Sequence, residues 1–294
     1  MRKKFRLAGI FATAVAMVAA MALPAMASAH TGEFAKFNNC PSTNTEVKKC
    51  LYSVTEGGYV ILGSKKVPIV NPVILQGGYG KADPESLQSK FYEATNGETL
   101  SKTAQPVPGG LAGFVNCKEI SFWLLRVSCE GVFENGLTGV NSTLELALPA
   151  SEIRISERAQ LFQEGTALKL PVKVHLENPL FGSSCYVGSS SEPIWWNLTT
   201  GTTSPPSPNS PITGAIGTGS LLEGETIVKY TGVKLVDNAW GAPGAHGCGG
   251  PLLEWALDPI VELSSGVPAA AGHNTANQEE VTLYTSPTKT VNAH

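Results

Sequence analysis

Residues 168–176 alternate between two kinds of side chain without a break, and this run constrains the fold more than any other feature of the chain. The positions on one side are Leu168, Leu170, Val172, Val174 and Leu176, and those on the other are Lys169, Pro171, Lys173 and His175. Because successive side chains of a strand point to opposite faces, the run predicts a strand with one buried side and one side facing water. Pro171 cannot donate a hydrogen bond to a neighbouring strand, so we expect an edge strand or a nearby bulge.

The N-terminal residues 1–29 have the pattern of an export signal. A basic stretch from Arg2 to Arg6 precedes an apolar run that Pro24 ends, and small residues up to Ala29 form a cleavage site. A membrane anchor would need about 20 apolar residues, which Pro24 prevents. We therefore expect a secreted, extracellular or cell-envelope-associated protein without a transmembrane segment in the mature chain.

The chain contains six cysteines, all beyond this signal. An even number in an exported protein predicts disulfides, although spacing alone does not choose among the possible pairings. The short separations favour Cys40–Cys50 and Cys117–Cys129, which leaves Cys185–Cys248 to close a long loop. Metal ligation by the cysteines is the weaker interpretation, because the chain has no C-x-x-C pair. We expect no cofactor.

The charge balance argues against nucleic acid as a partner. The chain has 21 basic and 24 acidic residues, a net charge of −3, and removing the four basic residues of the signal leaves 17 against 24, or −7. A mildly acidic exported protein has no electrostatic reason to bind nucleic acid. Its partners are otherwise unknown, with contact to the cell wall or an extracellular polymer as one option.

Residues 30–294 are expected to form a single β-rich extracellular domain. The low charged fraction of 15%, with 31 glycines and 20 prolines, suits short strands joined by many turns. The predicted fold is mainly β, an antiparallel β-sandwich or barrel-like sheet with two or three short helices, stabilised by disulfides.

Two helices are predicted from local signals. Asp83 can cap the first turn of a helix over 84–95, with Pro84 at its first position. A helix over 122–134 is preferred to a strand, because a strand would carry Cys129 too far from Cys117 for a disulfide. A further helical turn is possible at 251–257.

Residues 199–220 carry no charge and little apolar bulk. This composition, rich in Ser, Thr, Pro and Gly, predicts a long, exposed and mobile loop. We interpret it as an insertion within one domain, because a Cys185–Cys248 bridge would tie its two sides together.

No common catalytic signature is present. The sequence lacks a G-x-S-x-G elbow, an H-E-x-x-H motif, a phosphate loop and a dinucleotide fingerprint. The three aspartates, Asp83, Asp237 and Asp258, each lie beside a turn or a proline, where local hydrogen bonds account for them. The catalytic residues, if any, are unknown.

His30 is the one candidate for a metal site. Cleavage after Ala29 would make it the first residue, and its amine and imidazole could then chelate copper, as in copper-dependent polysaccharide oxygenases, which are β-sandwiches. Such a site needs a second histidine, for which His175, His246 and His273 are available. Otherwise His30 is an incidental first residue, His175 is solvent-exposed and His246 belongs to a loop.

Trp195 and Trp196 are ligand-binding candidates that could stack on a sugar ring. Adjacent strand residues face opposite sides, so at most one of the two would be exposed and the other would lie in the core.

Several segments resemble secreted actinobacterial proteins of unknown function. They are FNNCP, VPIVNPVILQGG, FENGLTGV and PVKVHLENPLFGSSCYVGS. The resemblance implies an exported β-rich protein and brings no known activity. The leading hypothesis is an exported non-catalytic extracellular or cell-envelope protein with a binding or structural role. The alternative is an enzyme that acts on an extracellular polymer, with copper dependence through His30 as one option.

Overall fold

The computed structural model describes residues 29–294, which fold into a mainly β structure. Fourteen strands form one antiparallel sheet, whose main path runs β11-β12-β14-β1-β3-β4-β7-β8-β6-β5. The predicted fold class, a mainly β protein with antiparallel pairing and short helices, is confirmed. The predicted signal peptide lies outside the described residues, except for Ala29.

The strands are β1 Lys49–Leu62, β2 Lys65–Pro68, β3 Val73–Ala82, β4 Ser89–Tyr92, β5 Ala104–Pro106, β6 Asn141–Leu146, β7 Arg154–Ile155, β8 Leu168–Glu177, β9 Tyr186–Val187, β10 Ile194–Leu198, β11 Thr218–Leu222, β12 Ile227–Asp237, β13 Ala245–His246 and β14 Thr275–Pro287. The α-helices are α1 Trp123–Glu134, α2 Glu157–Phe162, α3 Gly250–Ser265 and α4 Thr288–Val291. The 3₁₀ helices are η1 Gly32–Phe37, η2 Gly110–Gly113, η3 Cys117–Glu119 and η4 Ala150–Glu152.

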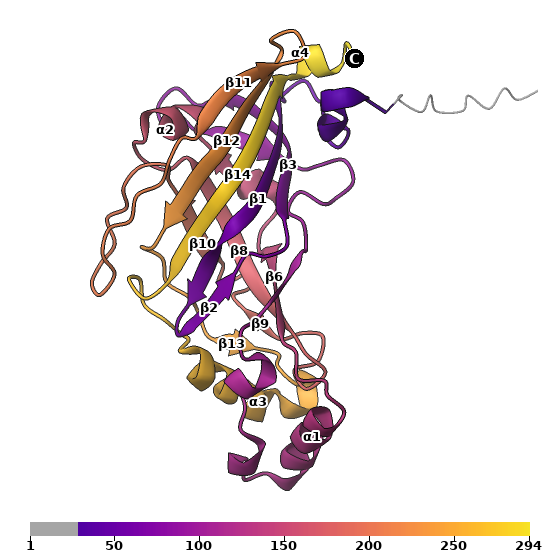
Figure 1. The fold of residues 1–294 in the computed structure, drawn as a ribbon, viewed down its shortest axis with the longest axis vertical. Coiled ribbons are helices and arrows are strands. Elements are labelled where there is room, and N and C mark those ends of the chain that lie inside the picture. Colours follow the sequence, from indigo (N-terminus) through magenta and orange to yellow (C-terminus); the bar gives the residue numbers. More distant parts are fainter. Residues whose placement is uncertain (1–28) are drawn as a thin grey trace, which may run out of the picture.

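The sheet curves back on itself along the length of an elongated molecule (Figure 1). Strand β14 pairs with β1 on one side and with β12 on the other. Strand β8 pairs with β7 and β6 on one side and with β10 on the other. Just beyond β10, Thr199 exchanges two backbone hydrogen bonds of 2.9 Å with Val236 of β12. This bridge ties the two ends of the curve together, so the sheet is barrel-like without being a continuous barrel.

The alternating run forms β8, as predicted. Its apolar members are buried and Lys169, Lys173 and His175 are intermediate in exposure. The predicted edge position is wrong, because β8 has neighbours on both sides. Pro171 is tolerated because it lies where one neighbour changes from β7 to β6, and its carbonyl accepts a 3.1 Å hydrogen bond from the Ala147 amide.

The main hydrophobic core extends from the inner face of the curved sheet to the buried sides of α1 and α3. A second, smaller cluster is built by η1, α4 and the strands next to them. Its buried members are Phe34, Phe37, Cys40, Val47, Cys50, Ile227, Tyr284 and Val291.

All three predicted disulfides are formed, and no cysteine is free among the described residues. The Cα atoms lie 5.5 Å apart in Cys40–Cys50, 5.6 Å apart in Cys117–Cys129 and 4.0 Å apart in Cys185–Cys248. The helix predicted over 122–134 is confirmed as α1, which buries Cys129 opposite Cys117, as the disulfide argument required.

The helix predicted over 84–95 is wrong. Asp83 does cap a turn, since its Oδ1 accepts hydrogen bonds from the backbone amides of Glu85 and Ser86 at 3.0 and 2.8 Å. Leu87 then adopts a φ of 56°, which stops a right-handed helix. The chain continues as β4 between β3 and β7, with Phe91 fully buried, so sheet pairing outweighs the local capping signal.

Helix α3 is longer than the helical turn predicted at 251–257. It spans 16 residues and contains Pro259 in its interior. Gly249 and Gly266 flank the helix with φ values of 81° and 70°, conformations that glycine adopts without strain. Among residues 29–294, no helix combines the length and the apolar content needed to cross a membrane.

The exposure predicted for residues 199–220 is present only in the middle of the segment. Thr199, Thr200 and Gly201 are buried, and residues 218–220 already belong to β11. The exposed middle is also anchored, because the Asn209 amide donates hydrogen bonds of 2.9 Å to the carbonyls of Asn238 and Asn274.

The anchor gives a testable expectation for the loop. Asn209→Ala should lower the free energy of unfolding by about 1–2 kcal/mol, because two carbonyl groups lose their donor. Ser204→Ala, in the same loop and exposed, should change it by less than about 0.5 kcal/mol. Urea unfolding followed by circular dichroism compares the two, and equal effects would mean that the loop is not anchored through Asn209.

Candidate functional site

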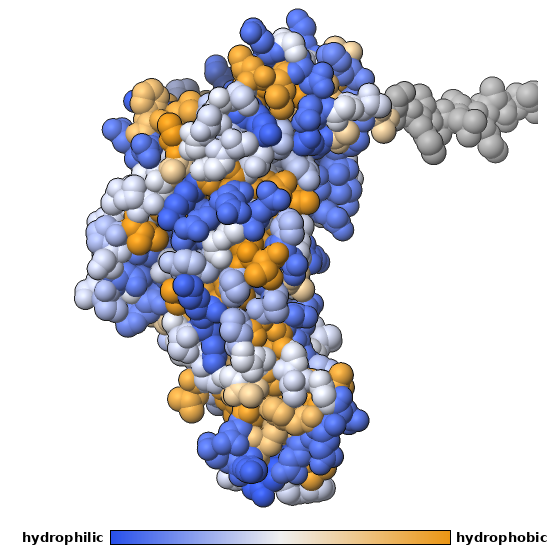
Figure 2. Space-filling view, in the orientation of Figure 1, coloured by the Kyte–Doolittle hydropathy of each residue, from blue (hydrophilic) through white to orange (hydrophobic). Residues whose placement is uncertain are grey.

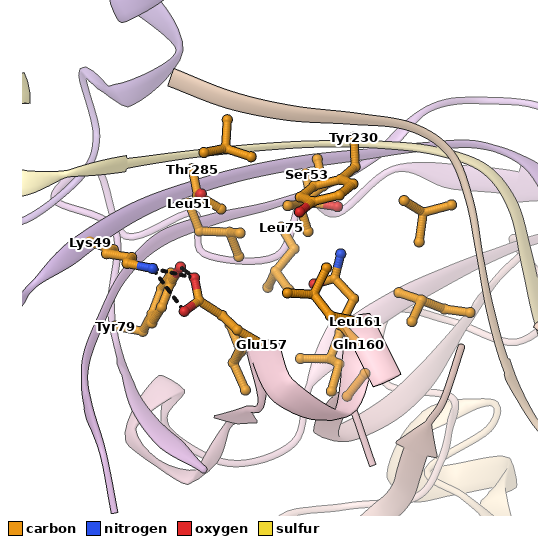
Figure 3. Close-up of a pocket in the computed structure, with 17 residues that line it drawn as sticks. Lys49, Leu51, Ser53, Leu75, Tyr79, Glu157, Gln160, Leu161, Tyr230 and Thr285 are labelled. Carbon is orange, nitrogen blue, oxygen red and sulfur yellow. Dashed lines mark hydrogen bonds and ion pairs between the residues drawn. The ribbon is translucent and has the colours of Figure 1, made fainter. Parts of the chain in front are cut away.

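A cavity of about 200 Å³ lies inside the curved sheet, beside α2. Figure 3 shows side chains of the sheet, including Ser53, Leu75 and Tyr230, on one side of it and those of α2 on the other. Most of the lining is apolar. The lining residues are Lys49, Leu51, Ser53, Leu75, Tyr79, Ile155, Glu157, Gln160, Leu161, Ala167, Leu168, Val228, Tyr230, Val233, Leu235, Leu283 and Thr285.

The local sequence explains why space remains here. On β1 the inward positions next to Leu51 are the small residues Ser53 and Thr55, which fill less volume than the leucines of the surrounding core. Helix α2 begins beside this space at its N-cap Ser156, whose hydroxyl accepts a 3.1 Å hydrogen bond from the Ala159 amide. The helix ends after two turns, where Gln163 adopts a φ of 58°.

One wall of the cavity carries a hydrogen-bonded group of three polar side chains. The Lys49 ammonium lies 2.6 and 2.8 Å from the two carboxylate oxygens of Glu157, and the Tyr79 hydroxyl donates to Oε1 at 2.6 Å. Burial, followed by the negative charge of Glu157, raises the pKa of the Tyr79 phenol well above its usual value. Tyr79 therefore stays protonated as a donor, and the charge of Glu157 is balanced by Lys49.

Gln160 supplies a free donor. Its side-chain amide nitrogen is buried and has no hydrogen-bond partner within the described chain. Figure 3 shows this nitrogen pointing from α2 toward the side of Tyr230 and Leu75. Because buried amide groups are normally hydrogen-bonded, the amide is available to an occupant of the cavity.

A smaller cavity of about 70 Å³ lies farther along the inside of the sheet. It adjoins the larger cavity along β1 and β3. Ser53 and Leu75 of these strands line the larger cavity. The next inward residues, Thr55 and Val73, line the smaller one. The two cavities are therefore successive spaces within one interior.

The outer face of β8 carries a second polar cluster. His175 stacks on Tyr186 of β9 with ring centroids 4.4 Å apart, and its Nδ1 lies 3.6 and 3.5 Å from carboxylate oxygens of Glu145 and Glu177. Lys173 lies 3.4 Å from Glu145 and 4.1 Å over the Tyr186 ring. The expectation that Lys173 and His175 simply face water is wrong, because the ring of Tyr186, from the paired strand β9, covers part of both side chains on this face.

The histidines considered for copper are on separate elements. The backbone amide of His30 donates to Asn38 at 2.7 Å, at the end of the described chain near η1. Figure 1 places β13, which contains His246, toward the α3 end of the molecule, and His273 precedes the start of β14. Within residues 29–294, no three His, Cys, Asp or Glu side chains form a group suited to a metal ion.

The tandem tryptophans divide as the alternation predicts. Trp196 is 1% exposed and packs against Trp240, with ring centroids 5.9 Å apart. Trp195 is half-buried, and the Lys169 ammonium lies 4.4 Å over its ring. Lys169 therefore already occupies one face of the ring that a sugar would use.

Apolar side chains are exposed at the end of the molecule formed by α1 and α3. Leu252 and Leu263 are 84% and 88% exposed, and Trp123 and Trp255 are also largely exposed. Figure 2 shows hydrophobic surface mixed with polar residues over this end. Exposed apolar surface of this kind is typical of a contact surface.

Sequence reasoning did not find the cavity. Its polar residues, Lys49, Tyr79 and Glu157, come from three separate elements, and none belongs to a recognisable motif. The available signal was the pair of small inward residues Ser53 and Thr55 on β1, which by itself does not distinguish a cavity from ordinary packing.

No family model matches the chain, and no curated protein or solved structure shows significant similarity to it. The resemblance to secreted actinobacterial proteins stays an expectation.

Proposed function

We propose that the chain is an exported, non-catalytic binding protein that holds a small, mainly apolar ligand inside its curved sheet. The observation that carries this proposal is the larger cavity, with its mainly apolar lining and the unpartnered amide of Gln160. Ligand sites are typically apolar cavities with a few polar groups that orient the ligand, and this cavity has that composition.

The polar groups of the cavity favour binding over catalysis. Glu157 is the one carboxylate among the described lining residues, and it is engaged by both Lys49 and Tyr79. Hydrolysis of a polysaccharide normally uses two carboxyl groups about 5–9.5 Å apart. One carboxylate that is already engaged by Lys49 and Tyr79 is better suited to forming part of the wall of a binding site.

Export is the second part of the proposal. It is supported by the signal-like residues 1–29 and by the three disulfides, which persist in oxidising compartments. A secreted or envelope-associated carrier would protect an apolar ligand from water outside the cytoplasm.

Filling the cavity tests the proposal. The wild-type protein should bind N-phenyl-1-naphthylamine, an uncharged apolar dye, with a saturable rise in fluorescence. Ser53→Phe should weaken dye binding at least about tenfold, because the new ring occupies the cavity and removes contact area worth about 25 cal/mol per Å².

Two controls locate the dye. Val54→Phe places the same ring one residue away, at a position that does not line the cavity, and should leave binding unchanged. Leu252→Ser with Trp255→Ser removes exposed apolar surface from α3 and should also leave it unchanged. Dye binding that survives Ser53→Phe but disappears in the α3 variant would overturn the proposal.

A further inference from the structure

Lys65 is a partly buried cation that lines the smaller cavity. Its ammonium donates a hydrogen bond to the carbonyl of Gly113 and lies 4.8 Å over the Phe114 ring. Within the described residues it forms no ion pair, in contrast to Lys49, Lys173 and Lys234. Burial lowers the pKa of Lys65, the direction expected for a cation that has lost water without gaining an anion.

Two further donors line the same cavity. The indole nitrogen of Trp196 and the hydroxyl of Ser265 are both buried without a hydrogen-bond partner among the described residues. Trp196 is 1% and Ser265 2% exposed, so bulk water does not solvate either group. Indole nitrogen can only donate, and the Lys65 ammonium has no acceptor atom, so the unmet need of this cavity is for acceptors.

Lys65 and Ser265 lie near each other. The backbone amide of Ser64 donates to the carbonyl of Ser265 at 2.7 Å, which joins the turn before β2 to the end of α3. Lys65 retains partial exposure at this turn, whereas Trp196 lies in the core. The smaller cavity therefore has a cation near the surface and apolar walls that lead inward toward Thr55 and Val73, where it adjoins the larger cavity.

We infer that the ligand is a monocarboxylate with a linear apolar chain, whose carboxylate binds Lys65 and whose chain follows the smaller cavity toward the larger one. This inference rests on the proposed function, because it names the chemical class of the molecule held inside the sheet. The carboxylate supplies the anion that Lys65 lacks and an acceptor for the nearby Ser265 hydroxyl, and the chain matches the apolar walls. The remaining polar groups of the larger cavity do not compete for the acid, because Lys49 is already paired with Glu157.

Displacement of the dye by dodecanoate and by dodecanol tests the inference. The wild-type protein should bind dodecanoate more tightly than dodecanol. Lys65→Met should weaken dodecanoate binding about ten- to a hundredfold, as expected for one hydrogen bond to a charged group, and leave dodecanol binding unchanged. Lys66→Met is the matched control, because Lys66 is exposed, packs over Tyr59 and does not line the cavity.

The outcomes separate this inference from the proposed function. Equal affinity of the wild type for acid and alcohol, unchanged by Lys65→Met, would overturn the carboxylate assignment while cavity binding stands. If Lys66→Met weakened dodecanoate binding as much as Lys65→Met, the effect would come from general surface charge, and the carboxylate assignment would also be overturned. If neither compound displaces the dye, and Ser53→Phe does not affect the dye, both the inference and the proposed function are wrong.

Discussion

Replacing Val172 by aspartate should prevent the protein from folding. Val172 is 0% exposed and lies in the middle of β8, opposite Ile194 of β10 and Leu146 of β6. The aspartate would bury a charge with no partner on a strand that has neighbours on both sides, which costs several kcal/mol, on the order of the whole stability of a domain. Far-UV and near-UV circular dichroism of the purified variant, or its loss from the soluble fraction on expression, measures the result.

The neighbouring residue provides the control. Lys173→Gln removes one ion pair with Glu145 and one contact with the Tyr186 ring, both on the outer face of β8. The expected loss is about 1 kcal/mol or less, since a partly exposed pair contributes little. Similar urea midpoints for Val172→Asp and Lys173→Gln would show that β8 does not have one buried face.

Removing the Cys185–Cys248 disulfide should have the second-largest effect. This bridge closes a segment with a sequence separation of 63, against 12 for Cys117–Cys129. Constraint of the unfolded chain grows with the logarithm of loop length, so loss of the longer bridge should cost about 4 kcal/mol, roughly 1.5 kcal/mol more than loss of the shorter one. Cys248 lies just before the start of α3, and its amide donates a 2.7 Å hydrogen bond to Asp258 in the middle of that helix, so the bridge also ties the start of α3 to the sheet.

Double serine variants of the two bridges allow the comparison. Replacing both cysteines of a bridge avoids a free thiol that could exchange with the remaining disulfides. Guanidinium unfolding of the two variants should rank the 185–248 variant as the less stable. The reverse order would mean that packing around α1, rather than chain constraint, determines what each bridge contributes.

The elements predicted correctly are those whose conformation is determined by residues close together in the sequence. The alternation of β8 predicts its buried face, and the one exception is Pro171, which is buried although it lies on the opposite side. The requirement that Cys117 and Cys129 approach each other selects a helix for α1. The division of Trp195 and Trp196 between surface and core follows from the same alternation.

The errors arise where distant pairing overrides local signals. Asp83 caps a turn as expected, but β4 follows because Phe91 is buried between β3 and β7, which the capping motif does not encode. Pro171 lies in a central strand because the neighbour on one side changes there. The cavity was missed for the same reason, since Lys49 and Glu157 are 108 residues apart in the chain and meet only in the folded sheet.

The most direct test of the interior binding site is a crystal structure of the protein with 12-bromododecanoate. Anomalous scattering locates the bromine at the far end of the chain from the carboxylate. Binding inside the sheet predicts a bromine peak within the spaces lined by Thr55, Ser53 and Tyr230. An empty interior, with bromine only on the exposed surface of α1 and α3 or at no ordered position, would contradict it.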